Sequence, residues 1–312
     1  MSIPVEQKEE IFCIQGKDGK EIFVQCWDKV QNPRGVVQIF HGMAEHGGRY
    51  GRFAEFLNEN GFIVYADDHR GHGKTAGAIE ELGYLGEDGF NSVVEDEHLL
   101  THRIKANHPG LPVIVFAHSF GSFVGQEYIT RYGSELRGII LSGSACKSGP
   151  DVTAAKSIAA IEMKLYGGRK KSHLVNSLAF SRFNSRIANP KQPFAWLSRD
   201  EEEVNKYEKD PFCGTVFTAN FFYFFFNGLS QLYRKDKIMQ IPKKLPVFIC
   251  AGDGDPVGDY GKSVKRLYAM YKGIGMEDVE MRLYPGARHE ILNETNRDEV
   301  FSHILDWMNK VV

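Results

Sequence analysis

The sequence from Val113 to Gly121 reads VIVFAHSFG, an apolar run that ends in a serine. A continuous apolar run of this length is typical of a strand covered on both faces. Residues 120–131 that follow have a helical pattern, so Ser119 lies at a strand-to-helix turn. Small residues two positions before and after the serine, Ala117 and Gly121, permit the close approach of strand and helix that a nucleophile elbow requires. A serine that only caps a helix is the alternative interpretation.

The same alternation of strand and helix extends along the chain. Strands are predicted at Ile11–Gln15, Glu21–Trp27, Gly35–Phe40, Phe62–Ala66, Val113–Ala117, Gly138–Ser142, Val247–Ala251 and Val279–Tyr284. Helices are predicted at about 50–59, 91–107, 120–131, 259–272 and 296–310. Gly16–Gly19 between the first two strands is a turn signal that favours a hairpin. The pattern indicates an α/β fold with a mostly parallel central sheet and helices on both faces.

A segment from about 148 to 236 interrupts this alternation and is too long for a loop in a compact domain. The segment is rich in residues that favour helices and in aromatic residues. We therefore expect a core domain formed by 1–147 and 237–312 and a helical cap inserted at 148–236. The cluster Phe221–Phe226 reads FFYFFF and has two possible roles, packing the cap or lining a pocket.

Composition excludes several classes of protein. The 312 residues include 38 Lys and Arg against 40 Asp and Glu, a formal charge of −2, which argues against nucleic-acid binding as the main role. The five cysteines are widely spaced and form no C-x-x-C motif, so neither a disulfide framework nor a zinc ribbon is expected. The N-terminus has no apolar signal core and no window is apolar enough to span a bilayer, which favours a soluble, cytoplasmic protein.

A serine is a weak nucleophile unless a base and an orienting acid lie beside it. In a parallel sheet these partners are expected in loops after later strands. His289 follows the strand Val279–Tyr284 and is the best candidate base. Three acids follow the strand before it, namely Asp253, Asp255 and Asp259; Asp255 is favoured and Asp253 comes second.

An oxyanion hole would take its donors from two backbone amides. The Phe120 amide directly follows the serine and lies at a helix N-terminus. Gly42 lets the chain turn sharply after the strand Gly35–Phe40, so the Met43 amide can face the serine. His41 is expected to hold this loop.

Histidines and carboxylates in two loops suggest a competing metal site. The residues concerned are His41, His46, His69, His72, Asp67 and Asp68. Neither an H-x-H-x-D-H run nor an H-E-x-x-H motif is present, so loop-fixing roles are favoured, with Asp68, His69 and Arg70 among them.

Four motifs in order carry a resemblance to a known family. They are HGMAEHGGRY at 41–50, DHRGHG at 68–73, AHSFG at 117–121 and YPGARHE at 284–290. Over about 10–147 and 237–312 the chain resembles the α/β-hydrolase fold, and within it the monoacylglycerol lipase and lysophospholipase group, also called the serine aminopeptidase S33 type. The segment 148–236 falls where that family carries its cap.

The resemblance implies an ester hydrolase that forms an acyl-enzyme and needs no cofactor or metal. It implies Ser119 as nucleophile, Asp255 as acid, His289 as base, and the Met43 and Phe120 amides as oxyanion hole. The expected substrate is a small ester or monoacyl lipid, and the cap is a possible site of transient contact with a membrane or micelle. The oligomeric state is not predicted.

Two alternatives remain beside this interpretation. The same triad supports amidase, peptidase, thioesterase or acyltransferase chemistry, and Glu201–Glu203 are candidates for binding a substrate amine. A binding protein without activity would have a broken triad, whereas all three residues are present here.

Overall fold

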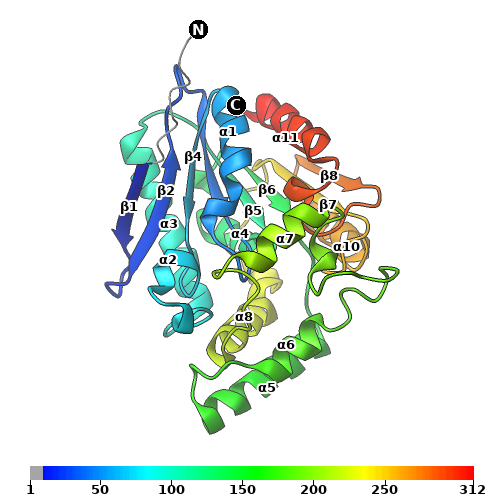
Figure 1. The fold of residues 1–312 in the computed structure, drawn as a ribbon. Coiled ribbons are helices and arrows are strands. Elements are labelled where there is room, and N and C mark those ends of the chain that lie inside the picture. Colours follow the sequence, from blue (N-terminus) through cyan, green and yellow to red (C-terminus); the bar gives the residue numbers. More distant parts are fainter. Residues whose placement is uncertain (1–9) are drawn as a thin grey trace.

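The computed structural model describes residues 10–312, and its centre is an eight-stranded sheet in the order β1-β2-β4-β3-β5-β6-β7-β8 (Figure 1). The strands are β1 (Glu10–Gln15), β2 (Glu21–Trp27), β3 (Gly35–Phe40), β4 (Phe62–Asp67), β5 (Val113–His118), β6 (Gly138–Ser142), β7 (Val247–Gly252) and β8 (Val279–Tyr284). β2 is antiparallel to both of its neighbours, and all later pairs are parallel. The predicted strands and the mostly parallel sheet are confirmed.

The N-terminal hairpin also forms as predicted. β1 and β2 pair with Gln15 opposite Glu21, and Gly19 in the turn has φ +81°. The N-terminal segment, in which the sequence predicts no apolar signal core, lies almost entirely in residues 1–9. These residues are outside the part of the chain that the structure describes. Within residues 10–312, no helix combines the length and apolarity needed to cross a membrane.

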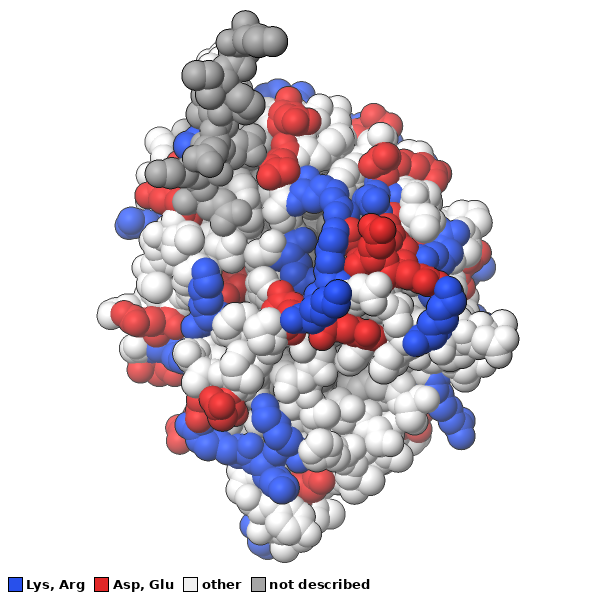
Figure 2. Space-filling view, viewed as in Figure 1, with Lys and Arg blue, Asp and Glu red and all other residues white. Residues whose placement is uncertain are grey.

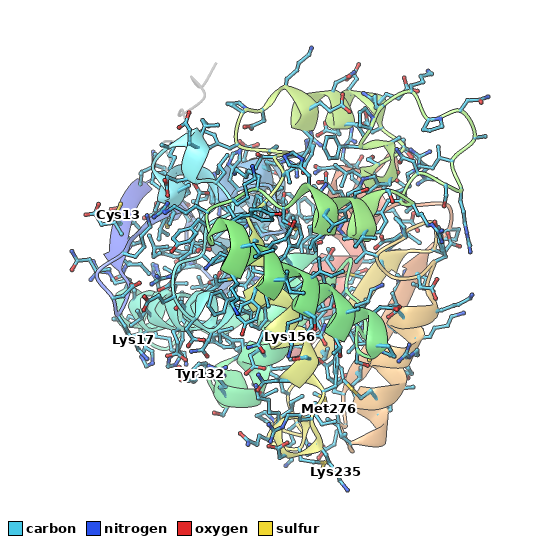
Figure 3. The ribbon with its side chains drawn as sticks, turned by 90° about the horizontal axis from the view of Figure 1, so that it is seen from below. Cys13, Lys17, Tyr132, Lys156, Lys235 and Met276 are labelled. Atoms are coloured by element: carbon cyan, nitrogen blue, oxygen red, sulfur yellow. The ribbon has the colours of Figure 1, made fainter. Side chains whose placement is uncertain are left out.

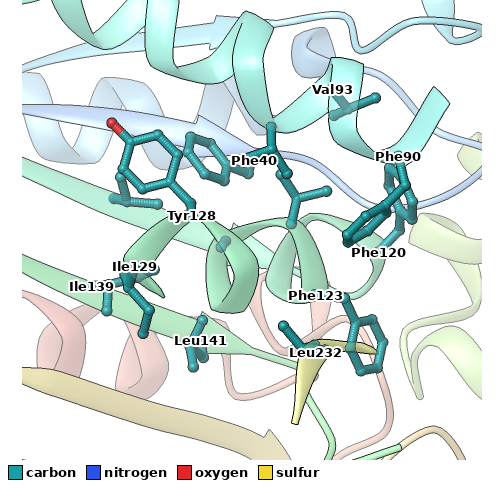
Figure 4. Close-up of a cluster of buried hydrophobic side chains, with 14 of the residues drawn as sticks. Phe40, Phe90, Val93, Phe120, Phe123, Tyr128, Ile129, Ile139, Leu141 and Leu232 are labelled. Carbon is teal, nitrogen blue, oxygen red and sulfur yellow. The ribbon is translucent and has the colours of Figure 1, made fainter. Parts of the chain in front are cut away.

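Helices cover both faces of the sheet. One face carries α1 (Gly51–Glu59) and α11 (Arg297–Val311), whose apolar side chains share a buried cluster with β3 and β5. The other face carries α3 (Gly89–Asn107), α4 (Phe120–Tyr132) and α10 (Lys262–Gly273). Figure 4 shows part of this second cluster, where Phe40 of β3 lies beside Tyr128 of α4 with ring centres 5.6 Å apart, and Leu141 of β6 belongs to the same cluster.

One predicted helix boundary is wrong. The helix expected from residue 259 begins only at Lys262, because Asp259, Tyr260 and Gly261 have positive φ values of 48°, 53° and 84°. Three consecutive left-handed residues cannot belong to a right-handed helix.

The segment between β6 and β7 is helical, as predicted. It contains α5 (Pro150–Tyr166), α6 (His173–Phe180), α7 (Glu201–Lys209), α8 (Ala219–Leu232) and the short α9 (Lys235–Ile238). The same segment also contains η4 (Ala195–Leu197), and shorter elements elsewhere are η1 (Gly47–Tyr50), α2 (Gly73–Ala76), η2 (Ile79–Glu81), η3 (Gly133–Glu135) and η5 (Ile291–Asn293). α5 packs along α8, and in the view from below they lie in front of the sheet (Figure 3).

The aromatic cluster of α8 packs the interior. Phe221 and Phe222 are 0% and 1% exposed and belong to the same buried cluster as Phe120 and Phe123. The Phe221 ring lies 5.1 Å from the Phe120 ring, centre to centre. No residue of Phe221–Phe226 lines the pocket beside Ser119, so of the two predicted roles the structure has the packing one.

Candidate active site

Ser119 occupies a sharp turn between β5 and α4. Its φ of 51° and ψ of −116° are rare for a residue with a side chain, and such strain gathers at functional sites. The Ser119 N–H donates to the Ser142 carbonyl at 3.0 Å, which fixes the turn to the neighbouring strand. A Cβ at Gly121 would lie 2.2 Å from the Phe40 carbonyl oxygen, so only glycine fits there.

His289 lies between Ser119 and Asp255. Its Nε2 is 2.8 Å from Ser119 Oγ, and its Nδ1 is 2.9 Å from Asp255 Oδ2. Asp255 is fully buried, and its Oδ1 accepts from the Val257 N–H at 2.8 Å. The three side chains thus form one continuous hydrogen-bonded chain.

The other two candidate acids make different contacts. Asp253 accepts a hydrogen bond from the Gly286 N–H at 2.6 Å and lies in an exposed turn. Asp259 occupies the left-handed turn before α10. Of the three acids, only Asp255 contacts His289.

The electrostatics of the two neighbouring imidazoles differ. Burial opposes the charged form of His289, but the Asp255 carboxylate outweighs it, with Glu290 and Glu45 adding to the effect, and raises the pKa of His289. Burial, together with the charge of His289, lowers the pKa of His118 to about 4. The two rings lie 4.8 Å apart, centre to centre, so a neutral His118 adds no repulsion when His289 takes a proton.

The loop after β3 places a second amide near the serine. Met43 lines the same pocket as Ser119. Within residues 10–312, the Met43 and Phe120 amides have no protein hydrogen-bond acceptor. His41 fixes this loop as expected: its Nδ1 donates to the Gly42 carbonyl at 2.8 Å, and its Nε2 accepts from the His69 N–H at 2.9 Å.

The two loops that the sequence suggests as a competing metal site make mainly contacts within the protein. Asp68 accepts from the Gly47 and Lys74 amides at 2.9 and 2.7 Å. Arg70 forms a buried ion pair with Asp96. His69 stacks on His41 with ring centres 3.9 Å apart, and its Nδ1 lies 3.0 Å from Asp67 Oδ2.

A pocket of about 570 Å³ opens at Ser119. Ligand pockets usually measure about 300–1,000 Å³. Its apolar lining residues are Met43, Ala44, Phe180, Pro193, Phe194, Trp196, Leu197, Tyr207, Val216 and Val257. Most of these come from the segment between β6 and β7, so that segment forms the wall facing the serine.

The sequence did not indicate a cluster of charged side chains behind the site, formed by Arg49, Glu45 and Glu290. The Arg49 guanidinium contacts both Glu45 and Glu290, each of them buried. Glu45 Oε1 also accepts from the Gly42 N–H at 2.5 Å and from the Tyr50 hydroxyl at 2.9 Å. All four side chains stand in or beside the quoted motifs, but nothing local in the sequence indicates that they meet.

The family model of serine aminopeptidase S33 matches residues 31–296. The chain belongs to this family. A monoacylglycerol lipase of Mycolicibacterium smegmatis is 30% identical over 302 residues, covering 94% of each chain. The human monoglyceride lipase is 25% identical over 94% of this chain and 88% of its own length.

Solved structures agree with this family assignment. A thermostable carboxyl esterase from Bacillus coagulans, crystallised with glycerol, superposes with a TM-score of 0.89 at 32% identity, covering 97% of this chain and 99% of the esterase. A soluble variant of the Saccharomyces cerevisiae monoglyceride lipase superposes with a TM-score of 0.75 at 24% identity, covering 100% of this chain and 97% of that one, a likeness of fold. This S33-family chain has the α/β-hydrolase fold and is a carboxylic ester hydrolase.

Proposed function

We propose that this chain cleaves monoacyl lipid esters through a Ser119–His289–Asp255 triad and an acyl-enzyme. The observation that carries the proposal is the unbroken hydrogen-bonded chain from Ser119 Oγ through His289 to Asp255, with distances of 2.8 and 2.9 Å. A serine, a base and an orienting acid in this order are what acyl transfer requires.

Acylation begins when Ser119 Oγ attacks the ester carbonyl and its proton passes to His289 Nε2. Asp255 holds the imidazole through Nδ1 and stabilises its positive charge. His289 then gives the proton to the departing alkoxide, so the alcohol leaves and the acyl group stays on Ser119. Water, deprotonated by the same imidazole, attacks the acyl carbon and releases the carboxylic acid.

The Met43 and Phe120 amides are proposed to bind the oxyanion that develops in both steps. Their N–H groups have no other acceptor in the described part of the chain, so both are free for this role. Each donor of this kind contributes about 2.7–4 kcal/mol to the transition state in other enzymes.

Pocket chemistry supports an uncharged apolar substrate. The acids that line it, Glu45 and Glu290, are both paired with Arg49, and so neither is available to bind an amine. Glu201 and Glu202 are exposed, and Glu203 pairs with Arg52 and Lys206. This arrangement favours ester cleavage over an aminopeptidase reaction, and the relatives named as monoacylglycerol lipases support a monoacyl lipid.

We further propose that residues 148–236 act as a cap over a core of 1–147 and 237–312, and that the cap touches lipid surfaces transiently. α5 and α6 lie at one end of the molecule (Figure 1), where Figure 2 shows uncharged surface beside a group of basic side chains. Ile161, Leu165, Tyr166, Leu174 and Leu178 on these helices are 53–65% exposed. α6 also contributes Ser177 and Phe180 to the pocket, which links the exposed apolar surface to the site.

The test is release of fatty acid from a long-chain monoacylglycerol, compared with hydrolysis of a short-chain aryl ester. Ser119→Ala is expected to abolish both activities and labelling by a fluorophosphonate. Ser181→Ala, which changes another serine lining the pocket, is the matched control and is expected to keep them. Cleavage of the short ester alone would restrict the chain to small esters, and labelling without ester cleavage would point to amides or thioesters.

A further inference from the structure

Two histidines and a glutamate converge on the surface of α3. His98 and His102 are four residues apart and therefore on one face of the helix. Glu135 lies in η3, just after α4. His98 Nε2 is 3.0 Å from His102 Nε2 and 2.8 Å from Glu135 Oε1. One atom from each of the three residues lies within 4.8 Å of the others.

With Glu135 ionised, His98 Nε2 cannot bond both of its close neighbours fully, whichever form the His98 ring takes. If His98 Nε2 carries a hydrogen, that single hydrogen faces two acceptors, Glu135 Oε1 and His102 Nε2. If it carries a lone pair, it accepts from His102 but lies 2.8 Å from a carboxylate oxygen with no hydrogen between them. A cation among the three atoms satisfies all of them at once.

Neighbouring side chains hold two of the three residues in position. The His98 ring stacks on Tyr132, with ring centres 3.5 Å apart and planes 7° apart. Lys105 binds the other carboxylate oxygen of Glu135 at 3.1 Å and so leaves Oε1 toward the histidines. The His102 side chain is 59% exposed, which gives an ion access from solvent. Tyr132 lies near the edge of the molecule in Figure 3.

We propose that His98, His102 and Glu135 bind a divalent transition-metal ion such as Zn²⁺. Two histidines at i and i+4 of a helix are a recurrent zinc-binding arrangement, and imidazole with carboxylate suits zinc. Zn–N bonds of about 2.0–2.1 Å in a tetrahedron require ligand atoms about 3.3–3.4 Å apart. The observed 3.0 and 2.8 Å separations need to open by only a few tenths of an ångström. Water takes the fourth position.

Two other groups of potential ligands are less suited to a metal. His46 Nδ1 accepts from the Gly48 N–H at 3.2 Å, so the ring hydrogen is on Nε2, the atom that faces Asp210 and Cys213. Burial also raises the pKa of the Cys213 thiol, which opposes the thiolate that a metal needs. The third group surrounds His69, whose side chain is 0% exposed, with no route for a hydrated ion.

The proposed site is separate from the ester-cleaving site. None of its residues lines the pocket at Ser119. It joins α3 to the segment that follows the C-terminal end of α4, and the N-terminal end of α4 carries the Ser119 turn. Bound metal therefore ties together two helices of one face of the sheet, and its expected effect is on stability rather than on the chemical step.

Calorimetric titration of the full chain with Zn²⁺ alone tests the proposal, together with thermal unfolding at increasing Zn²⁺. One equivalent is expected to bind and to raise the melting temperature. His102→Ala is expected to weaken this binding at least about tenfold, because a three-ligand site loses one ligand. Because His102 is exposed, the His102→Ala chain is expected to fold normally. Glu135→Gln is a second variant that tests the same site.

His46→Gln is the matched control, because it removes a histidine from the next-best cluster. Unchanged one-equivalent binding in this variant, with loss in His102→Ala, supports the site. Binding that survives both His102→Ala and Glu135→Gln, or the absence of one-equivalent binding in the unmodified chain, overturns it. Ester hydrolysis measured without metal is expected to be equal in the unmodified chain and in His102→Ala. Failure of the metal-binding proposal is therefore distinguishable from failure of the proposed ester hydrolysis.

Discussion

Arg49 holds Glu290 through two parallel hydrogen bonds, Nη1 to Oε1 and Nη2 to Oε2, each 2.7 Å long. Its Nη1 also donates to Glu45 at 2.5 Å. Glu290 directly follows His289, and Glu45 binds the amide of Gly42 in the loop that carries Met43. One guanidinium therefore connects the loop of the proposed base with the loop of the proposed oxyanion hole.

Replacing Arg49 by alanine is expected to cost about 3–5 kcal/mol of unfolding free energy, because it leaves two buried carboxylates without a partner. Turnover is expected to fall as well, since both loops lose their common anchor. Arg49→Lys keeps the charge but not the parallel hydrogen bonds and is expected to be intermediate. Urea unfolding and ester kinetics measure both effects; an Arg49→Ala chain as stable as the parent contradicts the bridging role.

Glu290 is expected to contribute to the pH dependence of stability. Burial by itself raises the pKa of Glu290, but Arg49 lowers it to about 2, whereas an unfolded glutamate titrates near about 4.3. A lowered pKa stabilises the fold above the unfolded value, and this contribution is lost as pH falls through about 2. Unfolding free energy should therefore fall less steeply with acid in Glu290→Gln than in the parent chain. Glu202→Gln on the surface of α7 is the control and should follow the parent curve.

Asp255→Asn is expected to reduce kcat about 10⁴-fold if Asp255 orients the base. Because Asp255 raises the pKa of His289, the residual activity is expected to rise at a lower pH than in the parent chain. Asp253→Asn changes the second candidate acid and is expected to keep the parent profile. The measurement is kcat/KM against pH for all three chains. A larger loss in Asp253→Asn would reverse the assignment of the acid.

Two phenylalanines of the segment between β6 and β7 are expected to respond differently to replacement by alanine. Phe222→Ala leaves a cavity in the core and is expected to cost about 3–5 kcal/mol of stability. Phe180→Ala removes a half-buried ring from the pocket wall, so it is expected to raise KM for long acyl chains with a smaller loss of stability. Thermal unfolding and a series of acyl chain lengths separate the two effects. An increase in KM confined to Phe222→Ala would place the acyl group against α8 instead.

Gly121→Ala is expected to destabilise the Ser119 turn and remove activity, because the added Cβ would lie 2.2 Å from the Phe40 carbonyl oxygen. Gly51→Ala is the matched control, since a Cβ at the first residue of α1 meets no atom within 4 Å. That change is expected to be neutral or to stabilise by up to about 1 kcal/mol. Unfolding and ester turnover compare the two; equal behaviour would show that the close contact at Gly121 is dispensable.

The sequence by itself determined the alternation of strands and helices, the hairpin and the position of Ser119 at a strand-to-helix turn. These features are local: strands buried on both faces read as apolar runs, and the turn needs small residues at fixed offsets. The start of α10 was missed because positive φ at Asp259 and Tyr260 leaves no pattern in residues that are not glycine.

Only the tertiary structure decided which acid reaches His289, which aromatic residues face the pocket and how Arg49 is paired. Three acids follow one strand in the sequence, which favours Asp255 without excluding the other two, and in the structure Asp255 lies 2.9 Å from the imidazole. These contacts join residues far apart in the sequence. The separation is 34 positions for Asp255–His289, 170 for Ser119–His289 and 241 for Arg49–Glu290. Such pairs meet because parallel strands end at one edge of a sheet, and the final distances depend on how the loops beyond that edge pack together.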